Sequence, residues 1–175
     1  MKRSDTAPIQ IAIAQLQLPL IVPYRLAFGE QRQFDVLLVG IADADGTGWG
    51  EATILPGYTD ETVEQSWRVA SEIAAQCKTV GQLKSAARAQ LHAAPFTATA
   101  FLTAIDWLNG HATLKRSGRF ELLGTVNGKH QQRDKLEQEI ENLIARGYKT
   151  LKVKIGWEPD EDLQQVKAVR EITEG

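Results

Sequence analysis

The stretch TLKVKIG, from Thr150 to Gly156, decides the fold of this chain. Side chains alternate between the two faces of a β-strand, so this stretch separates an apolar set from a basic set: Leu151, Val153 and Ile155 on one face, Lys152 and Lys154 on the other. The pattern predicts a strand with one packed face. Two interpretations of the other face stay open, because the lysines either lie in solvent or point inward toward an anionic group.

The residues on both sides of this stretch predict helices. A helix is expected from about residue 131 to 146, ending at Gly147, and another from about Asp160. A short strand is expected near residues 121–126, so the order is strand, helix, strand, helix, which is typical of parallel βα units. In a closed parallel barrel the outer face of each strand packs on helices, and the lysines would then point inside, near the C-terminal strand end where barrel enzymes place their chemistry.

The first fifty residues predict a three-stranded antiparallel meander. Apolar positions alternate from Ile9 to Ile13 and then shift to Leu16, which predicts a bulge or bend between them. Residues 20–33 show neither period and are expected to form a structured loop. A second strand is expected over residues 34–43, and an Asp-Gly turn leads from it into a third strand that contains Trp49 and Glu51.

Three helices are expected after the meander, at about residues 60–77, 81–92 and 97–109, with Thr59 or Asp60 as the N-cap of the first. The third is apolar on both sides and is expected to be buried, Trp107 included. After the third helix the predicted elements change from consecutive helices to alternating strands and helices. This change places a domain boundary near residues 115–122.

Composition narrows the class of protein. The 175 residues carry a formal net charge of −2 from 20 basic and 22 acidic side chains, which provides no basic footprint for nucleic acid or an anionic membrane. Cys77 is the single cysteine, and the three histidines are scattered, so neither suggests a local metal motif. The apolar stretch near the N-terminus is interrupted by glutamines and a proline and is no export signal, so a cytoplasmic location and a small soluble ligand are expected.

The order of motifs resembles the enolase superfamily, and specifically its mandelate racemase and muconate-lactonizing branch. The motifs that carry the resemblance run through nearly the whole chain: PLIVPYRLAFG at 19–29, GWGEA at 48–52, AIDWL at 104–108, ELLG at 121–124, KTLKVKIG at 149–156 and AVRE at 168–171. Each motif alone is weak, but their order and spacing together are specific.

The resemblance implies an α+β capping domain over residues 1–120, followed at 121–175 by the first two βα units of an incomplete TIM-like barrel. It also implies that Lys154 is a general base that abstracts a proton α to a carboxylate, giving a magnesium-stabilised enediolate in a racemase, epimerase or cycloisomerase. The neighbouring charge of Lys152 would stabilise negative charge and favour the neutral form of Lys154.

The same resemblance exposes a gap. The family's magnesium ligands are carboxylates on later barrel strands, so magnesium is expected for a complete enzyme but no metal ligand is assigned in this chain. Asp160, Glu161 and Asp162 are no substitute, because they stand at a helix start, where acidic residues complement the helix dipole. We therefore expect the chain to be an incomplete enzyme that is inactive alone.

In relatives, two loops of the capping domain help to choose the substrate, and here they correspond to five residues: Tyr24, Arg25, Phe28, Leu55 and Tyr58. The expected partner is a small carboxylate, with no nucleic acid or membrane, and a homo-oligomer is expected if the barrel is complete. Two alternatives stay open. The chain is a non-catalytic fragment that serves as an interaction module, or an unrelated α+β binding domain with both lysines in solvent.

Overall fold

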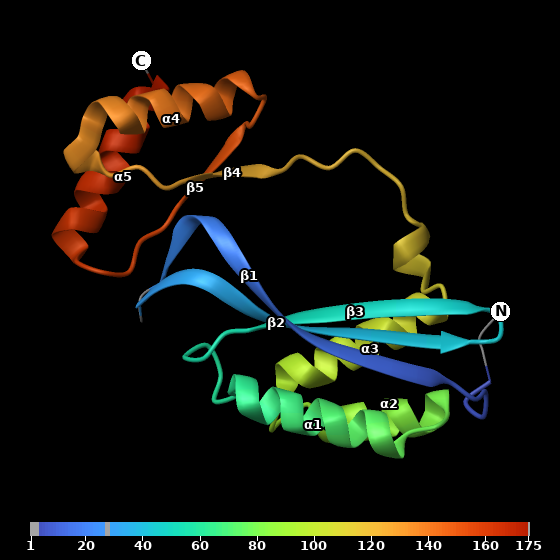
Figure 1. Cartoon of the computed structure of the whole chain (residues 1–175). Coiled ribbons are helices and arrows are strands. Elements are labelled where there is room, and N and C mark those ends of the chain that lie inside the picture. The colour runs from blue at the N-terminus through green and yellow to red at the C-terminus, as the bar shows by residue number, and fades with distance from the viewer. Residues whose placement is uncertain (1–3, 27–28, 175) are drawn as a thin grey trace. The chain divides into compact units, whose positions relative to one another are not determined.

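The computed structural model describes residues 4–26 and 29–174 and divides the chain into two compact units, Met1–Arg116 and Ser117–Gly175. Each unit has its own hydrophobic core. The first combines an antiparallel sheet with helices, and the second combines two parallel strands with two helices (Figure 1). The predicted fold class is confirmed: an α+β unit followed by the first βα units of a barrel-like arrangement.

The sheet of the first unit is the predicted antiparallel meander. It consists of β1 (Gln10–Leu26), β2 (Gly29–Asp43) and β3 (Gly46–Ile54), paired in that order. The Oδ1 atom of Asp43 accepts hydrogen bonds from the backbone N–H groups of Asp45 and Gly46, at 2.8 and 2.9 Å. These bonds fix the turn between β2 and β3, so the predicted Asp-Gly turn is confirmed.

The loop predicted over residues 20–33 is wrong, because the β1–β2 hairpin continues through it. Pairing resumes after a register shift between Pro19 and Tyr24 and extends to Leu26 opposite Gly29. β1 lies at the edge of the sheet, where prolines without an N–H donor interrupt few ladder hydrogen bonds. The sequence does not predict this part of the strand, because an edge strand with no fully buried face shows no alternation of apolar and polar residues.

The bulge predicted between Ile13 and Leu16 is also wrong. The pairing register runs without a break from Gln10 opposite Ala42 to Pro19 opposite Gln33. Ile13 packs against the helix-covered core, whereas Leu16 is 38% exposed. The apolar residues therefore change face along one regular strand, because the sheet carries apolar side chains on both faces.

Three helices cover one face of this sheet (Figure 1): α1 (Val63–Gln76), α2 (Val80–Ala89) and α3 (Pro95–Leu108). They confirm the three predicted helices with shifted ends. The N-cap of α1 is Thr62, whose side chain accepts from the N–H of Gln65 at 3.1 Å, and not Thr59 or Asp60. Thr59 instead accepts from the N–H of Glu61 in the preceding turn, so the helix starts later.

The central helix α3 is buried on nearly all sides, as its sequence predicts. Ala100, Phe101 and Ala104 are fully buried against the sheet and the other helices. Trp107 is the exception, because half of its side chain is exposed near the C-terminal end of the helix. A short 3₁₀ helix, η1 (Ala112–Lys115), follows.

The second unit consists of two βα units. β4 (Leu123–Val126) pairs in parallel with β5 (Thr150–Val153), and these strands alternate along the chain with α4 (Arg133–Ala145) and α5 (Pro159–Glu174). A 3₁₀ helix, η2 (His130–Gln132), precedes α4. The core contains apolar residues from both helices and both strands: Val126, Leu136, Ile140, Ala168 and Val169, with Leu151 and Val153 packed against them. The parallel pairing confirms the predicted order of parallel βα units.

In the part of the chain that the structure describes, no helix has the length and apolarity needed to cross a bilayer.

Candidate active site

The two lysines of TLKVKIG lie at and just beyond the end of β5. Leu151 and Val153 pack against the core formed with α4 and α5, so by strand alternation Lys152 lies on the opposite face, where it is exposed. Lys154 follows the last strand residue and is half-buried. The predicted separation of the packed face from the basic face is therefore confirmed for the residues within the strand.

Ile155 departs from the prediction. It lies beyond β5 and is 62% exposed, so it does not join the packed face. The strand ends early because Gly156 turns the chain with φ +115°, and the N–H groups of Gly156 and Trp157 donate to Oδ2 of Asp162 at 2.7 and 3.0 Å. A side chain of the following helix thus fixes the backbone immediately after Lys154.

Parallel pairing places the ends of β4 and β5 at one edge of the sheet. Val126 stands opposite Val153, so the loop at 127–132 and the residues that follow Val153 leave the sheet on the same side. This C-terminal edge is where parallel barrels carry their catalytic groups. At the same edge the Nζ atom of Lys129 lies 5.0 Å from the ring centroid of Trp157, which links the two loops.

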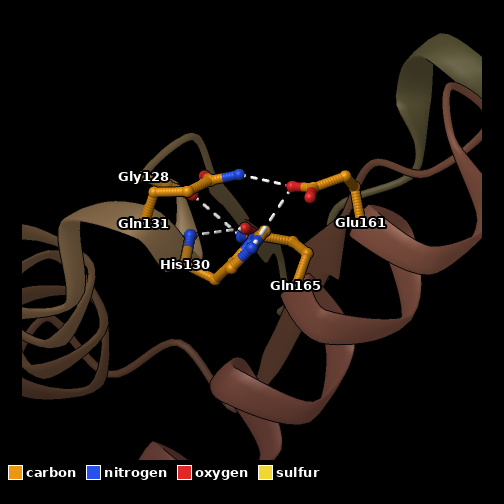
Figure 2. Close-up of polar contacts among 5 residues, drawn as sticks. All are labelled: Gly128, His130, Gln131, Glu161 and Gln165. Carbon is orange, nitrogen blue, oxygen red and sulfur yellow. Dashed lines mark hydrogen bonds and ion pairs between the residues drawn. The ribbon is translucent and has the colours of Figure 1, made fainter.

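Gln165, on α5, holds the loop that follows β4 (Figure 2). Its side chain is almost fully buried, and its Nε2 donates to the carbonyl oxygen of Gly128 while its Oε1 accepts from the N–H of His130, both at 2.8 Å. Nearby, Oε2 of Glu161 accepts from Nε2 of Gln131 and lies 3.3 Å from Nε2 of His130. The loop is therefore bound to α5 by backbone and side-chain contacts.

Glu139, on α4, holds the same loop from the other helix. Its carboxylate accepts from the N–H of Asn127 at 3.0 Å and from the N–H of Gly128 at 2.6 Å. Sequence reasoning missed both Glu139 and Gln165. Their partners lie 11 and 37 residues away along the chain, and no local pattern marks such a pairing.

The acidic trio lies where the sequence predicts. Asp160, Glu161 and Asp162 stand in the first turn of α5, and the last two serve the loop contacts described above. Among residues 4–26 and 29–174, no group of three or more His, Cys, Asp or Glu side chains could hold a metal ion. The residues described therefore do not fit a magnesium site by themselves.

The predicted substrate-contact residues lie in the first unit. Tyr24 is half-buried on β1, with its ring packed edge-on against Phe34 at a centroid distance of 5.8 Å. Tyr58 is 69% exposed in the turn after β3, where its N–H donates to the carbonyl of half-buried Leu55 at 3.1 Å. Arg25 belongs to β1, but its side chain and the whole of Phe28 lie outside the described residues.

Comparison with known proteins identifies curated relatives that are named as enzymes. No family model matches the chain. The chain is 27% identical to the o-succinylbenzoate synthase of Geobacillus kaustophilus over 86% of this chain and 44% of that protein. It is 29% identical to the hydrophobic dipeptide epimerase of Citrifermentans bemidjiense over 94% of this chain and 50% of that protein. The chain thus spans about half the length of the curated relatives that it matches.

Solved structures share the fold at similar coverage. A mandelate racemase/muconate lactonizing protein from Herpetosiphon aurantiacus matches 98% of this chain and 52% of its own, with a TM-score of 0.78 and 23% identity. A dipeptide epimerase from Cytophaga hutchinsonii, solved with Mg and the dipeptide D-Ala-L-Val, matches 94% of this chain and 49% of its own, with a TM-score of 0.79 and 18% identity. Both units therefore occur together in these larger chains.

Proposed function

We propose that this chain belongs to the mandelate racemase/muconate-lactonizing branch of the enolase superfamily and supplies the general base of an enzyme that abstracts a proton α to a carboxylate. The observation that carries the proposal is the position of the lysine pair. Lys152 lies on the strand face turned away from the helices, and Lys154 follows the C-terminal end of the same parallel strand. No observation favours a non-catalytic module.

Lys154 is the proposed base. Its neutral amine takes the α-proton while the electron pair of the C–H bond moves into the adjacent carboxylate. Asp162 holds the backbone just after Lys154 through Gly156 and Trp157, which limits the freedom of the main chain that carries the amine. Lys152 adds a positive charge close to the carbanion that forms, and an opposite charge there stabilises the transition state.

The first unit is proposed as the capping domain and the second as the start of the barrel. Tyr24, Arg25, Phe28, Leu55 and Tyr58 are proposed to contact the substrate. Relatives named as a synthase, an epimerase and a racemase support a small carboxylate as the substrate, with racemisation or epimerisation and cycloisomerisation or dehydration as the possible outcomes.

Magnesium belongs to the proposal only at the level of the whole enzyme. The dipeptide epimerases of Cytophaga hutchinsonii and Methylococcus capsulatus were solved with it. We assign no residue of this chain as its ligand. A cytoplasmic location and a homo-oligomer are likewise part of the proposal.

The experiment is α-proton exchange in deuterated water, followed by mass spectrometry or proton NMR. The chain is combined with the remaining barrel strands of a relative, in one polypeptide or as a second fragment, and tested on N-succinylamino acids and dipeptides with a divalent metal. Lys154→Ala should abolish exchange from one face of the substrate. Lys152→Ala should slow exchange without abolishing it.

Lys149→Ala is the matched control. Lys149 precedes the same strand and pairs with Glu121 at 3.0 Å on the surface, so its loss should leave exchange unchanged. Circular dichroism and thermal unfolding of each assembly establish that the fold persists. Full exchange in the folded Lys154→Ala assembly, on a substrate that the unmodified assembly exchanges, would rule out Lys154 as the base.

A further inference from the structure

The segment between β3 and α1, residues 55–60, is a short turn whose two flanking residues are buried in the first unit (Figure 1). Ile54, the last residue of β3, is 3% exposed, and Glu61, which follows the turn, is 1% exposed. Between them Tyr58 is 69% exposed, and its N–H closes the turn on the carbonyl oxygen of Leu55. The turn therefore presents Tyr58 at the surface between two buried ends.

Glu61 joins the end of this turn to the start of α3. Its carboxylate accepts hydrogen bonds from the N–H groups of Phe96 and Thr97, at 2.7 and 3.1 Å, and from the hydroxyl of Thr97. A carboxylate inside a protein is destabilising unless hydrogen bonds compensate for its lost hydration, and these three donors do so. Phe96 and Thr97 lie 35 and 36 residues away along the chain, so the contact ties the turn to a distant helix.

Thr97 extends the contact to α1. Its single hydroxyl proton goes to Glu61, so its oxygen accepts the hydrogen bond from the hydroxyl of Ser66, at 2.8 Å. Both hydroxyl-bearing residues are almost fully buried. Nearby, Nε2 of Gln65 donates to the carbonyl oxygen of Ala93 at 3.1 Å. The first turn of α1 and the start of α3 are thus bonded to each other beside Glu61.

Helix capping alone accounts for only part of this arrangement. Ala94, the N-cap of α3, provides no side-chain cap, and a carboxylate near a helix N-terminus is favourable. A cap can come from the N-cap residue itself, as Thr62 provides for α1. In α3 it comes instead from Glu61, the residue that ends the turn of Tyr58. The start of the helix and the end of the turn are therefore held by one contact.

We propose that Glu61 is a positioning residue for the substrate, because its contact with Thr97 fixes the turn that carries Tyr58 before the substrate binds. This inference rests on the proposed function, in which Tyr58 contacts the substrate. A turn that is already ordered loses little conformational freedom on binding, so the contact favours affinity. Glu61 takes no part in proton transfer, so its contact should affect KM and not kcat.

The first test measures the turn itself, by hydrogen exchange on the 175-residue chain without substrate. Thr97→Val removes the hydroxyl, and the Tyr58 amide should then exchange about tenfold faster or more, because a charge-assisted hydrogen bond that fixes the turn is lost. The amide of Gly46, which donates to Asp43 at the other end of β3, should keep its rate. Thr97→Ser keeps the hydroxyl and should restore the rate of Tyr58.

Thr99→Val is the matched control. Thr99 is an exposed residue of α3 whose hydroxyl donates within the helix, to the carbonyl oxygen of Pro95 at 2.8 Å, so its loss should leave the Tyr58 amide unchanged. An unchanged Tyr58 rate in Thr97→Val overturns the proposal. Equal acceleration of the Tyr58 and Gly46 amides also overturns it, because the variant would then loosen the whole unit and not the turn.

The second test measures the effect on catalysis, with the chain combined with the remaining barrel strands and a substrate that the unmodified assembly exchanges. Thr97→Val should raise KM about three- to tenfold and leave kcat unchanged. Tyr58→Ala should also raise KM, and adding Thr97→Val to it should cause no further rise, because the side chain that the turn positions is gone.

Additive effects of Thr97→Val and Tyr58→Ala on KM would overturn the positioning role, and so would a fall in kcat with KM unchanged. Failure of the proposed function has a different signature, because the unmodified assembly would then exchange no substrate at all. The hydrogen-exchange rates of Tyr58 would still decide, in that case, whether Glu61 and Thr97 fix the turn.

Discussion

Gly50 lies directly against the backbone of α3 at Ala100. A Cβ atom placed on Gly50 would stand 2.0 Å from the carbonyl oxygen of Ala100, and one on Gly48 would stand 2.1 Å from that of Ala104. The two glycines are two residues apart and so share a face of β3, and the two alanines are four apart and so share a face of α3. The two glycines of the motif GWGEA thus allow β3 and α3 to approach each other closely.

The first prediction follows from this contact. Gly50→Ala should lower the free energy of unfolding by about 3 kcal/mol or more, because the methyl group meets backbone that cannot rotate away. Chemical denaturation followed by circular dichroism measures the change. Gly118→Ala is the control, since a Cβ there meets only the ring of Phe120 at 3.4 Å, and its effect should stay within about 0.5 kcal/mol. Equal stability of the two variants would contradict the packing argument.

The second prediction concerns Glu61, a buried carboxylate that caps α3 from outside the helix. It accepts from the N–H groups of Phe96 and Thr97 at 2.7 and 3.1 Å, where Ala94 offers no side-chain cap. Glu61→Gln puts an amide NH₂ among these donors and should lower the free energy of unfolding by about 2 kcal/mol. Asp60→Asn, at the exposed neighbouring position, should change it little.

The third prediction concerns the loop after β4. Gln165→Ala removes both contacts with Gly128 and His130, so hydrogen exchange of the His130 amide should speed up more than that of amides in α1. Global stability should fall by about 1–3 kcal/mol because backbone groups lose partners. Gln164→Ala, one position earlier and exposed, should leave the exchange rate of His130 unchanged. If His130 exchanges at the same rate in both variants, Gln165 does not hold the loop.

The fourth prediction concerns Cys77, which is buried at the end of α1. Burial raises the pKa of its thiol above the ordinary 9.0, and the neighbouring charge of Lys78 opposes the shift only in part. The thiol should therefore react with iodoacetamide far more slowly in the folded chain than in urea, measured at pH 8 by mass spectrometry. Comparable rates in the two states would show that the thiol is accessible.

The same shift has a consequence for stability against pH. The pKa of the Cys77 thiol is higher in the folded chain than in the unfolded chain. The contribution of the protonated thiol to the free energy of unfolding is therefore fully present below pH 9 and is lost as the pH rises through the raised folded pKa. Cys77→Ala should be less stable at neutral pH because it leaves a small cavity, but its stability should fall less between pH 9 and 10.5. Denaturant unfolding at both pH values measures the difference.

Several features were predictable because neighbouring residues decide them. The alternation in TLKVKIG places Leu151 and Val153 on the packed face. The Asp-Gly turn at residues 45–46 is held by the side chain of Asp43, two residues earlier. The order of motifs also pointed to the kind of enzyme that the curated relatives are named as. Each of these signals depends on spacing or order along the chain, which the sequence shows directly.

Other features depend on contacts that the pattern of a single strand does not show. Ile155 fits the alternation of the strand, but β5 ends at Val153 and the chain turns at Gly156, whose N–H donates to Asp162 of the next helix. Leu16 fits a bulge, but the strand runs on without one because its neighbour in the sheet sets the register. In both places a contact outside the alternating pattern decides where the strand runs and where it ends.

The sequence by itself determined the order of strands and helices, the two faces of β5 and the identity of the lysine pair, because periodicity and capping are local properties of the chain. Only the tertiary structure decided that Glu139 and Gln165 hold the loop beside Lys154 and that α3 packs directly against Gly50. The physical reason is that these contacts form between residues whose separation along the chain carries no periodic signal, so only folding brings them within hydrogen-bonding or packing distance.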